Sequence, residues 1–171
     1  MVPAASCFTA TGDLDRAAFQ SNIDAYVGHG VDGVLVAGSS GESALLDDED
    51  RRQLLTWARA RLSDDQWLLA GVGSESTRQT ISRAHDAKAA GANAALVISP
   101  HYFLKRMTEP ALLAHFRAVA DASPLPVLLY NMPAYAHLVL SPAFVHEMAQ
   151  HENVIGRSEE RRVGKECSEP C

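Results

Sequence analysis

The chain has 171 residues, of which 47% are hydrophobic and 21% are charged, and its formal net charge is −6. This balance is typical of one globular domain and excludes a disordered or collagen-like chain. No apolar run reaches the ~18–20 residues of a membrane span, and the net charge is negative, so we expect neither a membrane nor nucleic acid as a partner. The first residues carry no basic or long apolar leader, which predicts a cytoplasmic protein.

Metal-ligating residue types are sparse. Three cysteines, Cys7, Cys167 and Cys171, are too few and too scattered for a disulfide framework. Cys167 and Cys171 have C-x-x-x-C spacing, but no second pair of ligands accompanies them. None of the seven histidines forms an H-E-x-x-H pair. The sequence therefore predicts no metal site.

Short apolar runs recur along the chain at intervals of ~30 residues, the length of one strand–helix unit. A weakly marked strand in Val2–Ser6 precedes them. Continuous apolar runs of this length are typical of parallel strands that are covered on both faces. The runs are Gly33–Ala37, Trp67–Val72, Ala94–Ile98, Pro126–Tyr130 and Asn153–Gly156.

The stretches between these runs carry helix signals. Thr108 and Ser141 are expected N-caps, each with a proline in the first turn, and Gly30 and Gly91 are expected at C-terminal caps. Asp47 precedes an acidic first turn, which favours the positive end of a helix. Apolar residues repeat every three or four positions in each stretch, as a buried helix face requires. The expected faces are Phe19, Ile23 and Val27; Leu54, Leu55, Ala58 and Leu62; Leu112, Leu113, Phe116 and Ala120; and Phe144, Val145 and Met148.

Strict alternation of strands and helices predicts an α/β fold with a parallel sheet, either an open doubly wound sheet or a (β/α)8 barrel. A dinucleotide-binding sheet would carry G-x-G-x-x-G after its first strand, and the one near match, beginning at Gly71, lacks the third glycine. In both architectures the chemistry gathers at the carboxyl ends of the strands. Candidate residues are therefore sought there.

Two such ends are rich in polar groups. The loop Gly38-Ser-Ser-Gly-Glu-Ser43 combines turn-forming glycines with the hydroxyls of Ser39 and Ser40, so it can hold a carboxylate, although a plain turn has the same composition. Tyr102 and Tyr130 follow later strands. A tyrosine in such a place suits a proton relay, and it equally suits a packed ring hydrogen-bonded to a neighbouring loop.

Three blocks, in this order and spacing, resemble the dihydrodipicolinate synthase / N-acetylneuraminate lyase family. They are Gly30–Ser43, Gly91–Tyr102 and Pro124–Pro133, and Thr9–Asp15 resembles the family's opening. The likeness extends from about Ala4 to Gly156. It implies a TIM barrel of class I aldolases, which form a Schiff base between a lysine on the sixth strand and a pyruvate-type 2-oxo acid, need no cofactor and are homo-oligomers, usually tetramers.

The resemblance also implies roles for individual residues. Ser39 and Ser40 match the hydroxyl pair that binds the substrate carboxylate, next to Gly41, and Ser40 matches the relay hydroxyl. Tyr130 matches the tyrosine that relays protons and contacts the 2-oxo acid. Tyr102 matches the relay tyrosine that some members contribute across a subunit interface.

Two departures from the family pattern bear on the activity. Tyr135 stands where the synthases have an arginine for the carboxylate of the aldehyde substrate, and a tyrosine has no guanidinium fork. Ser158 stands at the Schiff-base lysine position, and a hydroxyl cannot form an imine. The chain's lysines are Lys88, expected on a helix, Lys105, expected in a loop, and Lys165.

The composition changes after Gly156. Residues Arg157–Cys167 match one reading frame of a common short-read sequencing adapter, and the alternative is a natural solvated tail. We therefore expect a partial barrel over residues 1–156, with five βα units and the start of strand six, open edges and a tendency to associate. We expect the parent enzyme to be a lyase or aldolase and this chain to be inactive. A dihydrodipicolinate synthase or a non-catalytic ligand-binding relative are the alternatives.

Overall fold

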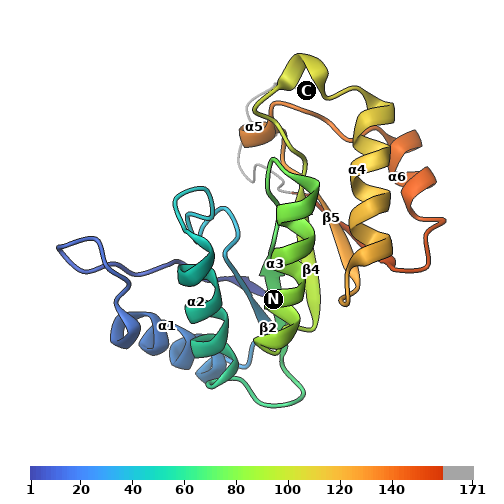
Figure 1. Cartoon of the computed structure of the whole chain (residues 1–171). Coiled ribbons are helices and arrows are strands. Elements are labelled where there is room, and N and C mark those ends of the chain that lie inside the picture. The colour runs from blue at the N-terminus through green and yellow to red at the C-terminus, as the bar shows by residue number, and fades with distance from the viewer. Residues whose placement is uncertain (160–171) are drawn as a thin grey trace, which may run out of the picture.

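The computed structural model describes residues 1–159, which form a six-stranded parallel sheet covered by helices (Figure 1). The strands are β1 (Val2–Pro3), β2 (Gly33–Val36), β3 (Trp67–Gly71), β4 (Ala94–Ile98), β5 (Val127–Asn131) and β6 (Val154–Glu159). The helices are α1 (Arg16–Gly28), α2 (Asp48–Arg59), α3 (Thr77–Ala89), α4 (Glu109–Ala122), α5 (Pro133–Ala136) and α6 (Pro142–Met148), with a 3₁₀ turn, η1 (Leu104–Arg106), before α4. This alternation confirms the expected α/β class.

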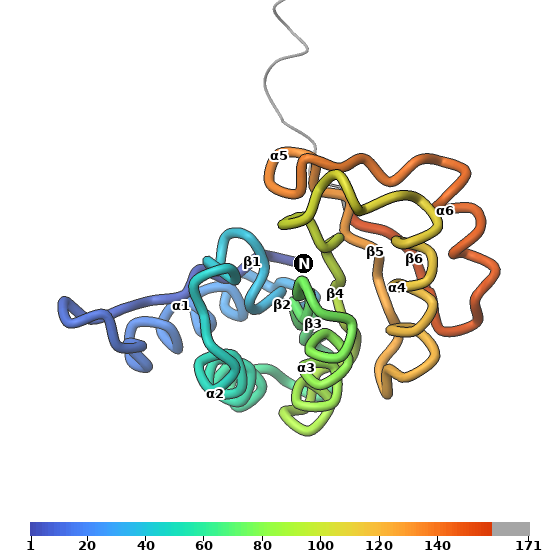
Figure 2. Tube along the Cα trace, turned by 45° about the horizontal axis from the view of Figure 1, so that its top comes forward, coloured from blue at the N-terminus to red at the C-terminus, as the bar shows by residue number. Residues whose placement is uncertain are grey.

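The order of the strands decides between the two expected architectures. Neighbours in the sheet are neighbours in the chain, β1-β2-β3-β4-β5-β6, whereas a doubly wound sheet reverses direction at a switch point. In Figure 2 the sheet curves, and the long helices lie along its outer side. A curved, singly wound parallel sheet with helices outside is the wall of a (β/α)8 barrel.

Side chains of the strands alternate between two apolar clusters, as the two-residue period of a strand requires. The larger cluster lies between sheet and helices and contains Val34 and Val36 of β2 together with buried residues of the helices, such as Phe116. The smaller cluster lines the inner, concave face and contains Leu69 and Leu96. The predicted helix faces, from Phe19 to Met148, belong to the larger cluster or pack against it.

Helix termini follow local sequence signals. Asp47 caps α2 in a reciprocal capping box, and Ser141 accepts a 3.0 Å hydrogen bond from the Phe144 amide. Gly30 and Gly91 follow α1 and α3 with φ of +72° and +86°. Thr108 precedes α4, but its side chain makes no capping bond within the described residues. Pro110, in the second helical position, has no N–H to donate, which leaves the Ala111 amide as the donor that a Thr108 cap would use.

The sheet ends differently from the sequence expectation at both edges. Strand β1 is only Val2–Pro3, rather than Val2–Ser6. Strand β6 continues past Gly156 to Glu159, because ladder pairing with β5 uses backbone groups whatever side chains follow. Within residues 1–159, β1 and β6 pair on one side only, and association through these edges stays a prediction. The rest of the expected tail, 160–171, lies outside the described residues.

The two proline-containing helix starts provide a matched test of capping. Ser141→Ala removes an observed side-chain cap, and we expect it to lower the free energy of unfolding by about 1 kcal/mol. Thr108→Ala removes a cap that makes no bond in the described structure, and we expect a change within ~0.5 kcal/mol. Urea denaturation followed by circular dichroism measures both. Equal losses of unfolding free energy in the two variants would contradict the view that Ser141 caps its helix and Thr108 does not.

Candidate functional site

Two hydroxyl groups from distant strands meet on the concave face of the sheet. Ser39 follows β2 and Tyr130 lies on β5, and their side-chain oxygens are 3.0 Å apart, a hydrogen-bond distance. Both side chains are half-buried, and Tyr130 packs against the inner cluster. A serine and a tyrosine hydroxyl in contact can pass a proton between them, because each is both donor and acceptor.

The loop after β2 is held by its own backbone. The amides of Gly41 and Ser43 donate to the Gly38 carbonyl at 3.1 and 3.2 Å, and the Glu42 amide donates to the Ser39 carbonyl at 3.1 Å. The Gly41 amide, expected to bind a carboxylate, is therefore already paired within the loop. Ser40 is exposed, and Ser39 rather than Ser40 contacts Tyr130.

This loop leaves β2 in a strained conformation. Ala37 is buried with φ of +55°, a region that side chains other than glycine rarely adopt. Its carbonyl oxygen lies against Gly71 at the end of β3, where a Cβ would come within 2.0 Å of it. The close approach of the two strand ends therefore requires glycine at position 71.

Arg51 of α2 connects the loop after β2 with the end of β3. Its guanidinium donates to the Gly71 carbonyl at 3.1 Å and to the Ser43 carbonyl. The side chain is only 6% exposed, and its Nε is buried without a hydrogen-bond partner in residues 1–159. Burial and, to a lesser extent, the neighbouring charge of Arg83 together lower the pKa of Arg51 to about 10. At neutral pH the group remains charged and acts as a fixed double donor.

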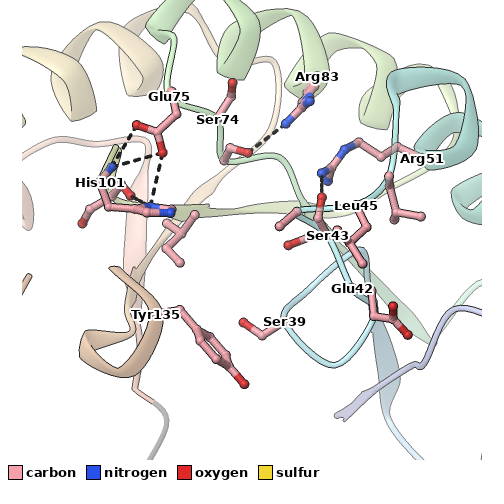
Figure 3. A pocket seen from close by; sticks show the side chains of 15 residues that line it. Ser39, Glu42, Ser43, Leu45, Arg51, Ser74, Glu75, Arg83, His101 and Tyr135 are labelled. Atoms are coloured by element: carbon pink, nitrogen blue, oxygen red, sulfur yellow. Dashed lines mark hydrogen bonds and ion pairs between the residues drawn. The ribbon is translucent and has the colours of Figure 1, made fainter. Parts of the chain in front are cut away.

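A cavity of about 520 Å³ opens at this end of the sheet (Figure 3). Its lining includes Ser39 and Arg51, together with Arg83 of α3 and with Glu75 and His101, which follow β3 and β4. Arg83 donates to the Asp48 carboxylate at 2.7 Å and to the Gly73 carbonyl at 2.9 Å. Tyr130 lines a separate, small cavity of about 20 Å³ that also touches Ser39. Ser39 thus joins the hydroxyl pair to the larger cavity.

The two remaining candidate tyrosines lie at the rim. Tyr102 is 76% exposed and its ring packs edge-on against Phe103, with 4.9 Å between ring centroids. Tyr135 in α5 is 59% exposed and lines the large cavity with Ser39. Tyr102 does not join the Ser39–Tyr130 pair within the described chain.

Strand β6 brings Ser158 beside the hydroxyl pair. Ser158 is the register partner of Tyr130 in the β5–β6 ladder, so both side chains belong to the concave face. Lys88 lies on α3 and Lys105 in η1, and both are exposed on the surface. Lys165 lies outside the described residues. Neither of the two described lysines therefore reaches the concave face near Tyr130.

Searches of residues 1–159 found no cluster of three or more histidine, cysteine, aspartate or glutamate side chains that could hold a metal ion. None of the helices described there is both long and apolar enough to cross a membrane.

Comparison with known proteins decides the family. The sequence model of the Dihydrodipicolinate synthetase family matches residues 1–162. The chain belongs to this family. The family assignment agrees with the sequence resemblance and with the curved parallel sheet.

Its relatives include synthases and aldolases. The chain is 42% identical over 155 residues to a 4-hydroxy-tetrahydrodipicolinate synthase of Stenotrophomonas maltophilia, which covers 91% of this chain and 52% of that protein. It is 40% identical over 160 residues to a probable mitochondrial 4-hydroxy-2-oxoglutarate aldolase of Emericella nidulans, with the same two coverages. The chain thus spans about half the length of the curated relatives it matches.

Solved dihydrodipicolinate synthetase family structures share its fold. YagE, a prophage protein of the family from E. coli K12 solved in complex with pyruvate, aligns with a TM-score of 0.86 at 35% identity. The alignment covers 92% of this chain and 53% of that chain.

Sequence patterns missed two polar residues that line the cavity, Arg51 and Glu75. Arg51 lies three and four positions before Leu54 and Leu55, on the stripe that the helix buries. A charged residue on a buried stripe signals an internal partner, because an isolated buried charge is costly. Glu75 lies in a polar loop, where no local pattern distinguishes it.

Adjacent arginines allow a test of the link between the strand ends. Arg51→Lys keeps the charge but loses the fork that donates to two carbonyls, and we expect it to lower the free energy of unfolding by about 1–3 kcal/mol. Arg52→Lys is the control, because Arg52 forms only exposed pairs with Glu49 and Asp86. We expect it to leave the free energy of unfolding unchanged within the error of the measurement, because ion pairs in solvent contribute little to stability. A chemical denaturation series that ranks Arg52→Lys as the worse variant would refute the assigned role.

Proposed function

We propose that this site serves the making or breaking of a carbon–carbon bond of a pyruvate-type 2-oxo acid, through a Schiff base with a lysine at position 158. The observation that carries the proposal is the Ser39–Tyr130 hydroxyl pair with position 158 beside it in the β5–β6 register. In this chain position 158 is a serine, so the chain itself is proposed to be catalytically incompetent.

The hydroxyl pair fits the proton transfers that this chemistry needs. When an amine adds to the 2-oxo carbon, a carbon–nitrogen double bond replaces the carbonyl, both amine protons move to the departing oxygen, and water leaves. Tyr130 is proposed to carry these protons, in contact with Ser39. Ser39, rather than Ser40, is thus the proposed relay hydroxyl, while Ser40 is left to bind the substrate carboxylate. Tyr102 is proposed to act across an interface between copies of the protein, which makes the active form a homo-oligomer.

The nature of the second substrate depends on Tyr135. A guanidinium at this position would bind a second carboxylate through two parallel hydrogen bonds, and a phenol offers a single hydroxyl. We therefore favour an aldolase or lyase whose aldehyde partner lacks a carboxylate. Dihydrodipicolinate synthesis with another carboxylate anchor is the alternative, and the synthase and aldolase relatives at 42% and 40% identity do not separate the two.

A non-catalytic relative that binds a ligand at the Ser39–Ser40 loop is the alternative from another class. It is favoured by Ser158, because the rest of the site keeps its hydroxyls while the amine is missing. Genomic DNA that carries the codons for Arg157–Cys171 would support it. An open frame that continues with a lysine codon at position 158 would support the enzyme.

Borohydride trapping tests the Schiff-base proposal. The chain is incubated with pyruvate and borohydride, and its intact mass is measured. We expect no adduct, because Ser158 is not an amine. We expect a stoichiometric adduct at position 158 when Ser158→Lys is combined with the C-terminal half of the Stenotrophomonas relative. In that chimera Tyr130→Phe slows adduct formation by ~10²–10⁴-fold. An adduct on Lys88 or Lys105 of the unaltered chain would overturn the proposal.

The same chimera tests the substrate class through Tyr135. We expect aldol addition of pyruvate to an uncharged aldehyde to exceed addition to a carboxylate-bearing aldehyde of the same length. Tyr135→Arg supplies a fork for the carboxylate and raises the relative kcat/KM for the charged aldehyde by ~10-fold or more. Tyr135→Phe is the control and leaves the preference unchanged. A preference for the charged aldehyde with Tyr135 in place would favour the synthase alternative.

A further inference from the structure

The carboxylate of Glu75 holds the loop that follows β4. Glu75 lies between β3 and α3, and its two carboxylate oxygens accept the His101 amide at 3.2 and 3.0 Å. One of the same oxygens accepts the Tyr102 amide at 2.9 Å. Two successive backbone donors thus converge on one anion, an arrangement in which charge-assisted hydrogen bonds are short and strong.

The His101 side chain adds a third contact to this carboxylate. Its Nδ1 lies 3.3 Å from a Glu75 oxygen and 3.1 Å from the carbonyl oxygen of Ser99, which is itself buried (Figure 3). The loop is therefore fixed at its buried start by Ser99 and at its middle by Glu75. The Tyr102 side chain begins directly after these contacts and extends outward from the rim.

We propose that Glu75 is the positioning residue for Tyr102. Its carboxylate fixes the backbone at His101 and Tyr102, and so it sets the direction in which the Tyr102 side chain points into solvent. The significance for catalysis rests on the proposed relay role of Tyr102. The positioning itself is independent of that role, and it can be measured in the chain as it is.

The alternative view is that these contacts follow passively from a rigid loop. Thr108 makes no capping bond to the described residues, and the loop from Phe103 to Met107 contains only a three-residue 3₁₀ turn. Of the residues between β4 and η1, Ser99 and Pro100 are buried, whereas Tyr102 and Phe103 after them are 76% and 64% exposed. A segment with so few buried side chains depends on its polar contacts for order.

Substitutions at position 75 separate the effect of the carboxylate charge from the effect of the size of the side chain. Glu75→Ala removes both acceptor oxygens, and we expect the amides of His101 and Tyr102 to exchange with deuterium about tenfold faster. Glu75→Gln keeps one neutral oxygen and gives an intermediate rate. Glu42→Gln is the matched control, because Glu42 lines the opposite wall of the same cavity and is not bonded to this loop in the described structure. In the Glu42→Gln variant we expect the amides of His101 and Tyr102 to exchange at the same rates as in the parent chain.

The experiment is amide exchange by NMR together with fluorine spectra of the chain labelled with 3-fluorotyrosine. Val97 on β4 reports global opening, and Tyr130 reports the hydroxyl pair. With Glu75→Ala we expect the Tyr102 fluorine signal, assigned by Tyr102→Phe, to narrow and move toward that of free fluorotyrosine, while Tyr130 and Val97 are unchanged.

Three results would overturn the proposal. Exchange at His101 and Tyr102 within twofold of the parent would show that the carboxylate does not hold the backbone. Equal acceleration at Val97 would show a global loss of stability. An unchanged Tyr102 fluorine signal would show that the side chain takes its direction from elsewhere. None of these results bears on the borohydride trapping, so failure of this proposal and failure of the Schiff-base proposal are distinguishable.

Discussion

Curvature of the sheet is the constraint on which the candidate site depends. Ser39 and Tyr130 come from β2 and β5, which are three strand spacings apart in the ladder. In a flat sheet with spacings of ~4.8 Å these strands would be separated by about 14 Å, too far for their side-chain oxygens to meet. The observed 3.0 Å contact therefore exists only because the sheet bends inward and brings the two strand ends face to face. Contact between the two groups is a property of the barrel wall, not of either loop alone.

Close backbone contacts and charged side chains hold the strand ends in this arrangement. Gly71 lets the end of β3 touch the Ala37 carbonyl, and Arg51 then joins Gly71 to Ser43. A buried guanidinium is costly to desolvate, and here two backbone carbonyls rather than a carboxylate offset that cost. A charged side chain also binds backbone groups beyond β4, where the Glu75 carboxylate accepts hydrogen bonds from the amides of His101 and Tyr102. The loops that carry Ser39 and Tyr102 are thus each fixed by a charged side chain, which is Arg51 of the same strand–helix unit in one case and Glu75 of the preceding unit in the other.

Local signals predicted much of the fold, and long-range contacts account for what was missed. The positive φ of Gly30 and the Ser141 cap depend on residues within a few positions, so the sequence alone indicates them. Tyr130 and Ser39 were candidates because both stand at the carboxyl end of a strand, but their contact depends on the curvature of the sheet. Arg51 and Glu75 act on residues 20 and 26 positions away, at Gly71 and His101. No periodic pattern encodes such pairs, and only the fold brings them together.

At Ser158 the backbone determines where the residue lies, and the side chain determines what chemistry it can perform. Pairing of β5 with β6 is made by backbone groups, and it sets position 158 beside Tyr130 whichever side chain is present. The hydroxyl pair in turn depends on β2, β5 and the curvature between them, and not on the residue at 158. Under the proposed function, a serine in place of a lysine at position 158 removes the nucleophile and leaves the surrounding hydroxyls where they are. The proposed ligand binding and the proposed covalent chemistry are therefore separable at a single residue.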